Sequence, residues 1–315
     1  MARQAFTLVE LIVTIAIVSI LMAIILPAVQ AVHGAARRMH CSSNLRQLGL
    51  ANANYESTYG CFVRAGGHKH TLLSYLGELA IYESKAPWND QDWEAAYRPI
   101  ADRAPAVYRC PADAAPDVII DGGVRLSMVN FLGCQGNNNW TRHSMRNGMF
   151  VWHDYDPQSG QYIARYVRIA DVVRGTSNVA LMSEVLHSTE ETYQTASRLR
   201  IVWRMPQPYT TSQFDAFASQ CESIPPDAAA RGWRGVNYLG IPWYAGGEGA
   251  ETYYHSLPPN RPSCSNDGGV ASGLYTAASL HGGGVNVLYV DGHVAFVGED
   301  IDRRVWRAMG ARDVE

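Results

Sequence analysis

The pattern of apolar and polar residues sets the first 59 residues apart from the rest of the chain. Phe6 to Leu26 is an apolar run of roughly 20 residues, long enough to cross the ~30 Å hydrocarbon layer of a membrane as one helix. Beyond Pro27, apolar residues recur at helical or whole-turn spacing with polar residues between them: Val32, Ala36, Met39, Leu45, Leu48 and Tyr55. Gly60 marks a helix C-terminus. The pattern predicts one helix from Phe6 to Tyr59, half in lipid and half packed on a folded domain.

In the remaining chain, segments with helical spacing come first and short runs of β-forming residues follow. Helices are expected at His70–Ser84, from Asn89 to about Arg103, and at Thr211–Ser219. Short β-rich runs predict strands at Val107–Cys110, Ser127–Leu132, Gly148–His153, Gln161–Ile169, Val179–Glu184 and Arg198–Met205. Residues 156–160 are expected to form a hairpin turn, and residues 225–267, rich in Gly, Pro and Asn, a long loop region.

Near the end of the chain, Asp291-Gly292 separates two β-rich runs. Val285, Val287 and Tyr289 alternate with Asn286, Leu288 and Val290 before it, and Val294 and Phe296 follow. Asp-Gly between such runs predicts a β-hairpin with a type I′ turn, which needs positive φ at both central residues.

Glu10 interrupts the apolar run. An unpaired carboxylate inside a membrane costs at least ~2.5 kcal/mol, and the run contains no Lys or Arg to pair with it. An ordinary signal peptide, cleaved near Val29–Ala31, would have an apolar core of only about 7 to 15 residues. A plain membrane anchor remains open, but it gives Glu10 no role.

A small residue, then FTLVE, then a long apolar helix resembles the N-terminus of type IV prepilins and type II secretion pseudopilins. The resemblance implies that a prepilin peptidase and methyltransferase cleaves between Ala5 and Phe6 and methylates Phe6. It implies that Glu10 meets the charged terminus of a neighbouring subunit, and that Pro27 is the helix-kinking proline. The family has Gly where this chain has Ala5.

A second resemblance, to large pilin-like proteins with an ectodomain of unknown function, rests on three segments. They are RRMHCSSNLRQLGLANANYESTYG, IADVVRGTSNVALMSE (Arg174 replaces the family's Asp), and the H-x9-DG ending of His281, Asp291 and Gly292. The two resemblances imply an α+β, type IV pilin-like fold, with the long helix packed on an antiparallel sheet that carries loop-rich insertions. Residues 1–5 would be the leader, 6–26 the transmembrane helix, 27–59 its continuation, and 60–315 the ectodomain.

Charge and cysteine content narrow the partners. A net charge of −3 with 17% charged residues provides no basic field, which argues against nucleic acid as a partner. Six cysteines on an exported segment favour disulfides: Cys41, Cys61, Cys110, Cys134, Cys221 and Cys264. Cys41 and Cys61 would lie ~30 Å apart on the helix and cannot pair. Cys221–Cys264 is the preferred bridge, because it closes the loop region, and about 12 of the 15 pairings stay open.

The candidate chemistry is sparse. His281 with Asp291 could form a metal pair or a base with its orienting acid, joined by His68 and His70, but no set of three ligands at metal spacing and no GxSxG motif occurs. We expect Asp291 in a turn, His281 hydrogen-bonded at a strand entry, and His68 and His70 in loops, with no catalysis, cofactor or metal. A structural calcium ion held by loop oxygens is the alternative, with Glu184, Asp113 and Asp267 as possible ligands that are otherwise solvated. The loop aromatics Trp243, Tyr244, Tyr253 and Tyr254 could bind glycans, but packing is their commoner use.

Two function classes follow. The first is a minor or specialised subunit of a pilus or pseudopilus, assembled with other pilin-like subunits through the N-terminal helix. The second is an extracytoplasmic binding module that uses this helix only for delivery. In both, the protein passes once through the cytoplasmic membrane with its N-terminus in the cytoplasm, where Arg3 lies, although Arg37 and Arg38 beyond the helix weaken the charge contrast.

Overall fold

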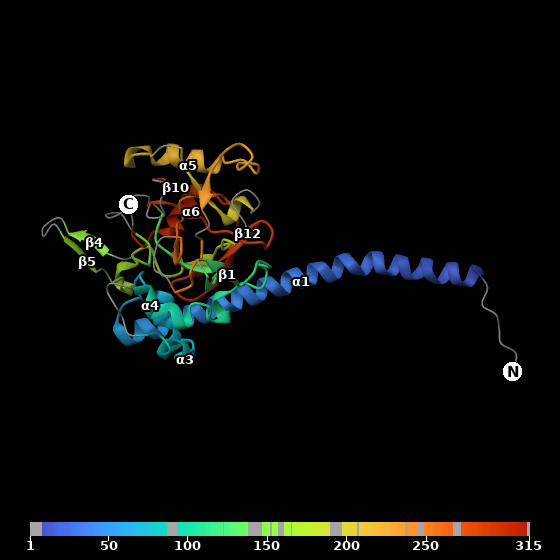
Figure 1. The fold of residues 1–315 in the computed structure, drawn as a ribbon, viewed down its shortest axis with the longest axis horizontal. Coiled ribbons are helices and arrows are strands. Elements are labelled where there is room, and N and C mark those ends of the chain that lie inside the picture. Colours follow the sequence, from blue (N-terminus) through green and yellow to red (C-terminus); the bar gives the residue numbers. More distant parts are fainter. Residues whose placement is uncertain are drawn as a thin grey trace.

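The computed structural model describes residues 8–86, 93–121, 123–137, 147–151, 153–156, 161–164, 166–189, 197–206, 208–236, 239–244, 249–266 and 272–313. Its dominant element is the helix α1, Leu8–Tyr59, which extends far from a folded ectodomain at one end (Figure 1). The helix continues through Pro27, and Gly60 follows it with a φ of 69°. The predicted single long helix is confirmed over the described residues.

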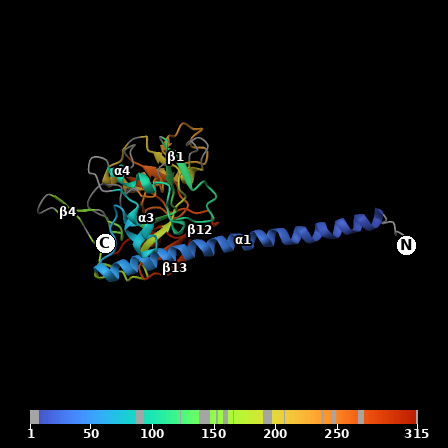
Figure 2. The ribbon, with the colours of Figure 1, turned by 60° about the horizontal axis from the view of Figure 1, so that its bottom comes forward.

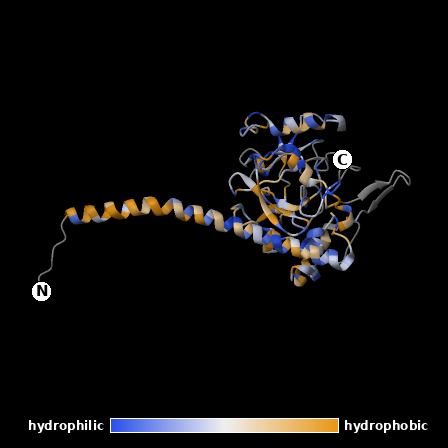
Figure 3. Cartoon of the chain, turned by 180° about the vertical axis from the view of Figure 1, so that it is seen from behind, coloured by the Kyte–Doolittle hydropathy of each residue, from blue (hydrophilic) through white to orange (hydrophobic). Residues whose placement is uncertain are grey.

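The two halves of α1 have different surroundings. Figure 3 shows an apolar half that projects away from the ectodomain and a mixed half that lies against it. The buried positions of the second half follow helical spacing: Cys41, Asn44, Leu45, Leu48, Gly49, Ala51 and Asn52. Val32 and Met39, which the pattern placed on the packed face, are 67% and 66% exposed, because the buried positions of α1 begin only at Cys41.

A five-stranded sheet packs against this second half of α1, which runs alongside β12 and β13 in Figure 2. Its order is β13-β12-β6-β3-β9, with β3 Phe131–Cys134, β6 Ala180–Glu184, β9 Thr252–Tyr253, β12 Gly284–Tyr289 and β13 Val294–Gly298. All neighbours are antiparallel except β3 and β9. A Cβ at Gly49 would lie 2.9 Å from Leu288, so the missing side chain allows α1 to approach β12 closely. All six residues of β12 are buried, since strands flank it on both sides and α1 covers one face.

A second, four-stranded sheet lies away from α1. Its order is β11-β10-β7-β8, with β7 Val202–Arg204, β8 Gly235–Val236, β10 Ser263–Ser265 and β11 Gly273–Leu274. It shares a separate apolar core with the helix α5, Phe214–Glu222, which lies at the opposite side of the ectodomain from α1 in Figure 1. Trp203 and Phe217 are fully buried in this core, and the four aromatics predicted in the loop region are buried elsewhere in the ectodomain. Packing is therefore the role of those four side chains.

The other elements are short. They are α2 His68–Thr71, η1 Leu72–Tyr75, α3 Leu79–Glu83, α4 Trp93–Tyr97, η2 Arg98–Ile100, η3 Ala106–Tyr108, β1 Val118–Asp121, β2 Val124–Ser127, β4 His153–Asp156, β5 Gln161–Ala164, η4 Ile169–Asp171, η5 Arg198–Arg200, η6 Thr211–Gln213 and α6 Arg303–Gly310. The strands β1 and β2 form one antiparallel pair, and β4 and β5 form another, which confirms the hairpin expected around residues 156–160.

Several predicted elements are wrong or broken. The helix expected over His70–Ser84 splits at Gly77, whose φ of 78° is incompatible with a right-handed helix. The strand expected at Val107–Cys110 is wrong, because its first two residues lie in the 3-10 turn η3 and the other two form no strand. Within Gly148–His153, residues 148–151 form no strand, because the N–H groups of Gly148 and Met149 donate to Gln135 and Cys134 in an irregular loop.

The strand predicted at Val179–Glu184 is confirmed as β6, and the helix predicted at Thr211–Ser219 as η6 and α5, whereas three other predicted elements survive only as shorter pieces. Ser127–Leu132 divides between the end of β2 and the start of β3, and Arg198–Met205 divides between η5 and β7. The helix expected from Asn89 shortens to α4 and η2, and Asn89 itself lies outside the described residues.

Candidate functional site

The three sequence segments that carry the ectodomain resemblance meet at one place. Cys41 comes from α1, Glu184 ends β6, His281 precedes β12, and Cys110 follows η3. Each offers one ligand-type atom, and the four atoms lie within 4.8 Å of one another. We call these four residues the motif cluster. Sequence spacing could not join them, because they come from four separate elements.

The geometry of the motif cluster centres on Glu184 and His281. Nε2 of His281 lies 3.0 Å from Oε1 of Glu184 and 3.4 Å from Sγ of Cys110. Asn286 donates its backbone N–H to Oε2 of Glu184 at 2.7 Å and its side-chain amide to Oε1 at 2.9 Å. The side chains of His281 and Glu184 are only 2% and 1% exposed. His281 is hydrogen-bonded at the entry of β12, as predicted, but the expectation that Glu184 is mostly solvated is wrong, because β6 is the central strand of its sheet.

Two disulfides are present. Cys41–Cys110 has a Cα separation of 5.0 Å and joins α1 to the ectodomain. Cys221–Cys264, the preferred bridge, is confirmed, with a Cα separation of 5.9 Å. Cys61 and Cys134 are free, so Cys41 and Cys61 do not pair, as their spacing required.

The H-x9-DG residues do not gather at a single point. His281 and Asp291 lie before and after the six-residue strand β12, which spans ~20 Å at about 3.3 Å per residue. Asp291 Oδ1 accepts the backbone N–H of His293 at 3.1 Å, within the turn. The alternative in which His281 pairs with Asp291 is therefore excluded, while the expected turn role of Asp291 is confirmed.

The hairpin turn also differs from the prediction. Gly292 donates to the carbonyl of Tyr289, the N–H of Tyr289 donates to the carbonyl of His293, and Leu288 pairs with Val294. The loop thus has three residues, and Gly292, with a φ of 90°, is its one residue at positive φ. This is a type I turn closed by a glycine bulge rather than a type I′ turn, because Asp291 keeps a negative φ.

The motif cluster does not have the arrangement of a nucleophilic cysteine site. In such a site the histidine accepts the thiol proton at one ring nitrogen while a carboxylate holds the other nitrogen. Here the same nitrogen, Nε2, faces both Cys110 and Glu184, and Cys110 is in a disulfide. The set also suits calcium poorly, because calcium takes six to eight oxygen ligands and the cluster offers one carboxylate.

A second cluster of buried ionisable side chains is centred on Glu251. Glu251 accepts the N–H groups of Gly66 and Gly67, and Nδ1 of His68 lies 3.2 Å away, off the hydrogen-bonding direction. Nζ of Lys69 donates to the carbonyl of Ala250 at 2.9 Å. Burial lowers the pKa of His68 and lowers that of Lys69 to about 7, even though the Glu251 carboxylate opposes both shifts. Burial alone would raise the pKa of Glu251, but His68 and Lys69 hold it below its usual value.

His68 and His70 were expected in loops, and that expectation is wrong, since both lie in α2 and are buried. Asp113 is also buried rather than solvated. Its carboxylate pairs with the two terminal guanidinium nitrogens of Arg200, and Nε2 of His187 lies 3.6 Å away. Burial favours a raised pKa for Asp113, but these neighbours lower it overall. Asp267 lies outside the described residues.

Of the predicted processing and assembly residues, Glu10 and Pro27 lie in α1. Ala5 and Phe6 are outside the described residues, Glu10 is in the first turn of α1 with an exposed side chain, and Pro27 is inside the helix. By length and composition, α1 is the one helix among the described residues that could cross a membrane, and its most apolar window has no buried residue.

Comparisons with known proteins agree at both ends of the chain. Residues 30–304 match the family model described as a protein of unknown function (DUF1559), and residues 1–26 match the prokaryotic N-terminal methylation motif. Neither description names an enzymatic activity. No curated protein and no solved structure matches the chain.

Proposed function

The chain belongs to the DUF1559 family and begins with a prokaryotic N-terminal methylation motif, and from this premise we propose that it is a minor or specialised subunit of a type IV pilus or type II secretion-like filament. It is exported, anchored by residues 6–26 and cleaved between Ala5 and Phe6, with the ectodomain outside the cytoplasmic membrane. Its partners are the prepilin peptidase and methyltransferase and other pilin-like subunits.

The observation that carries this proposal is the exposure of the first half of α1. Large apolar side chains from Leu8 to Leu26 are between 50% and 74% exposed. Each such side chain gains about 1.5–3 kcal/mol on full burial, so the exposed face must be covered from outside the chain. Lipid covers it before assembly, and the equivalent helices of neighbouring subunits cover it in a filament.

The test of processing is the mass of the N-terminal peptide of protein extracted from membranes. The mature chain is expected to begin with N-methylated Phe6. An N-terminus at Met1, or one near Val32 left by a signal peptidase, would contradict the proposal. Phe6 without a methyl group would separate cleavage from methylation.

A pocket beside β7 of the four-stranded sheet favours an additional role as a binding module. It has a volume of about 510 Å³ and is lined by Arg204, Arg231, Arg234 and Trp233, among others. Arg231 is paired with Asp227, whereas Arg204 and Arg234 have no carboxylate partner among the described residues. Guanidinium groups bind carboxylates and sulfates, and an indole packs on a sugar ring, so the pocket suits an acidic saccharide.

This second role is tested by the binding of the full chain in detergent to an acidic oligosaccharide and to a neutral one of the same length. Preference for the acidic ligand that disappears in Arg204→Ala with Arg234→Ala supports the binding role. Equal binding of both ligands excludes it.

A further inference from the structure

We propose that the motif cluster is a zinc site in the thiol state of the protein. Cys41, Cys110, His281 and Glu184 bind Zn²⁺ when the Cys41–Cys110 bridge is open, and the same two sulfurs form the disulfide when it is closed. This inference concerns the ectodomain and does not depend on filament assembly.

The first argument is the convergence of four donor atoms. Two sulfurs, one imidazole nitrogen and one carboxylate oxygen lie within 4.8 Å of one another. In four-coordinate zinc, with zinc–sulfur distances of about 2.3 Å and zinc–nitrogen distances of about 2.0 Å, neighbouring ligand atoms lie roughly 3.3 to 3.8 Å apart. The Cα separation of 5.0 Å between Cys41 and Cys110 leaves both thiolates within reach of one ion. Small side-chain rotations therefore complete the site.

The second argument is the position of the imidazole. Nε2 of His281 lies 3.0 Å from Oε1 of Glu184 and 3.4 Å from Sγ of Cys110. This geometry is unsuited to proton relay, because one nitrogen contacts both groups. It suits a metal, because the nitrogen, the carboxylate oxygen and the sulfur are close enough to one another to bind one ion.

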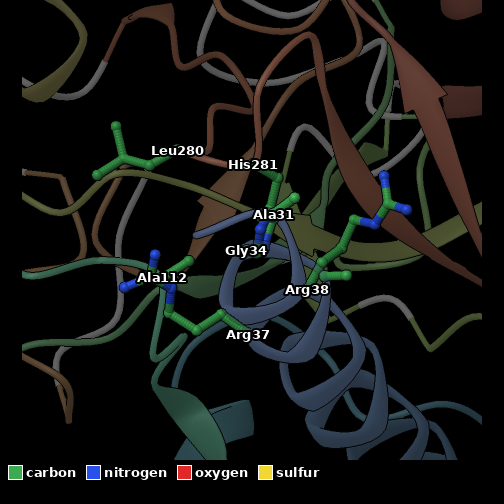
Figure 4. Close-up of a pocket in the computed structure, with 8 residues that line it drawn as sticks. Ala31, Gly34, Arg37, Arg38, Ala112, Leu280 and His281 are labelled. Carbon is green, nitrogen blue, oxygen red and sulfur yellow. The ribbon is translucent and has the colours of Figure 1, made fainter. Parts of the chain in front are cut away.

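The third argument is the support around the ligands. Asn286 holds both oxygens of Glu184 through its backbone N–H and its side-chain amide, the kind of outer contact that orients a metal-binding carboxylate. A pocket of about 520 Å³ opens beside α1 and is lined by His281, Leu280, Arg37 and Arg38, among others (Figure 4). His281 forms part of its wall, so the pocket lies directly beside the cluster. Two thiolates with one imidazole and one carboxylate favour zinc over magnesium or calcium.

The exchange between the disulfide state and the zinc-bound state balances in electrons and protons. To open the Cys41–Cys110 bridge, an external dithiol gives up two electrons and two protons, and it becomes a disulfide in doing so. Binding of Zn²⁺ by the two resulting thiols releases two protons. Oxidation by a disulfide-class oxidant reverses both steps and expels the ion, since a disulfide leaves only two donors in the cluster. In either state the cluster attaches α1 to the ectodomain, so zinc holds the helix in place before the bridge forms.

The experiment uses the full chain in detergent. One sample is reduced with a phosphine and the other is left oxidised. Both receive zinc chloride and are desalted, and their metal content is measured. The reduced chain is expected to retain one more zinc ion per chain than the oxidised chain. Cobalt in place of zinc is expected to show the visible absorption of tetrahedral Co²⁺ and a thiolate-to-cobalt charge-transfer band. Equal zinc in both samples, or cobalt without thiolate bands, overturns the proposal on the unmutated chain alone.

Matched variants locate the site. Cys41→Ala with Cys110→Ala is expected to lose the extra zinc, whereas Cys221→Ala with Cys264→Ala, which removes the other disulfide, is expected to keep it. Asn286→Ala, which removes a positioning residue, is expected to weaken zinc binding about 10- to 100-fold. Zinc that follows Cys221 and Cys264, or that persists without Cys41 and Cys110, contradicts the assignment to the motif cluster.

Discussion

The two halves of α1 belong to one continuous helix but differ in what covers their apolar side chains. In the first half Leu21 is 53% exposed, whereas in the second half Leu45 is fully buried against the ectodomain. Both are leucines on a helix, so residue type does not decide their burial. What differs is whether another part of the same chain lies against the helix. The first half therefore depends on lipid or other chains, and the second half belongs to the fold of the ectodomain.

The polar residues of the two halves show the same contrast. Thr14 and Ser19 donate to carbonyls of their own helix, Leu11 at 2.8 Å and Ile15 at 2.7 Å. Asn44 instead donates to the carbonyl of Arg109, 65 residues away in the sequence, at 2.8 Å. A helix in lipid must satisfy its polar groups within itself, whereas a helix on a folded domain can satisfy them across an interface.

The largest expected effect is a loss of filament assembly caused by a substitution in the first half of α1. Glu10→Ala is expected to remain in the membrane fraction and to be lost from sheared filaments, because an ionised carboxylate in an apolar environment gains most from meeting a cation, which the pilin resemblance places on the methylated terminus of another copy. Ser19→Ala is the control, since Ser19 bonds only to its own helix in the described structure. Unchanged assembly of Glu10→Ala would favour a plain anchor.

The next largest effect is a weaker attachment of the second half of α1 to the ectodomain when the Cys41–Cys110 bridge is removed. Replacing both Cys41 and Cys110 with Ala removes a bridge across 69 residues, and replacing Cys221 and Cys264 removes one across 43 residues. Loop-closure entropy gives each bridge about 4 kcal/mol of stability under oxidising conditions without zinc. Thermal unfolding should show similar losses for both pairs. Limited proteolysis should cut near Arg46 more readily only in the first pair, and equal cutting in both would contradict a role for Cys41–Cys110 in holding α1.

A leucine pair compares the halves directly. Leu45→Ala is expected to lower the free energy of unfolding of the ectodomain by about 3 kcal/mol, because it leaves a cavity in the core. Leu21→Ala, the same change on an exposed site, is expected to alter it by less than about 0.5 kcal/mol. Urea unfolding followed by tryptophan fluorescence measures both. A comparable loss in the two variants would mean that the first half also packs on the ectodomain.

The smallest effect concerns the hairpin of β12, the strand against which the second half packs. Gly292→Val is expected to cost about 1 to 2 kcal/mol, because Gly292 has a φ of 90° and a Cβ there meets no atom within 4 Å, so the cost is backbone strain alone. Gly34→Val is the control, since Gly34 is helical and a Cβ there also meets nothing within 4 Å. Thermal unfolding of both variants gives the comparison, and equal stability would remove the backbone argument.

Patterns among residues close together in the sequence predicted the elements that depend mainly on interactions between such residues. The long helix follows from apolar spacing between Phe6 and Tyr59, and the final hairpin follows from Asp291-Gly292. The type of turn was wrong, because the number of loop residues depends on the register of β12 and β13. The helix over His70–Ser84 was wrong because Gly77 adopts a positive φ, which a right-handed helix cannot accommodate.

The candidate site shows the limit of such patterns. The resemblance singled out His281 and the segment that ends in Glu184, but their contact, and that of Asn286 with Glu184, needs β6 and β12 side by side. The pairing of Cys41 with Cys110 likewise needs α1 across the sheet, and distance along a helix could only exclude Cys61. Spacing in the sequence also gave no sign that Glu251 would be buried beside His68 and Lys69.

The sequence by itself determined the membrane-length helix, its prepilin-type start and the family of the ectodomain, because these depend on composition and on residues close together in the chain. Only the tertiary structure decided which half of α1 is buried and which cysteine meets Cys41. It also decided that the H-x9-DG ending places His281 beside Glu184 and not beside Asp291. These outcomes depend on contacts between segments tens to hundreds of residues apart, which are set by the packing of the whole sheet against the helix.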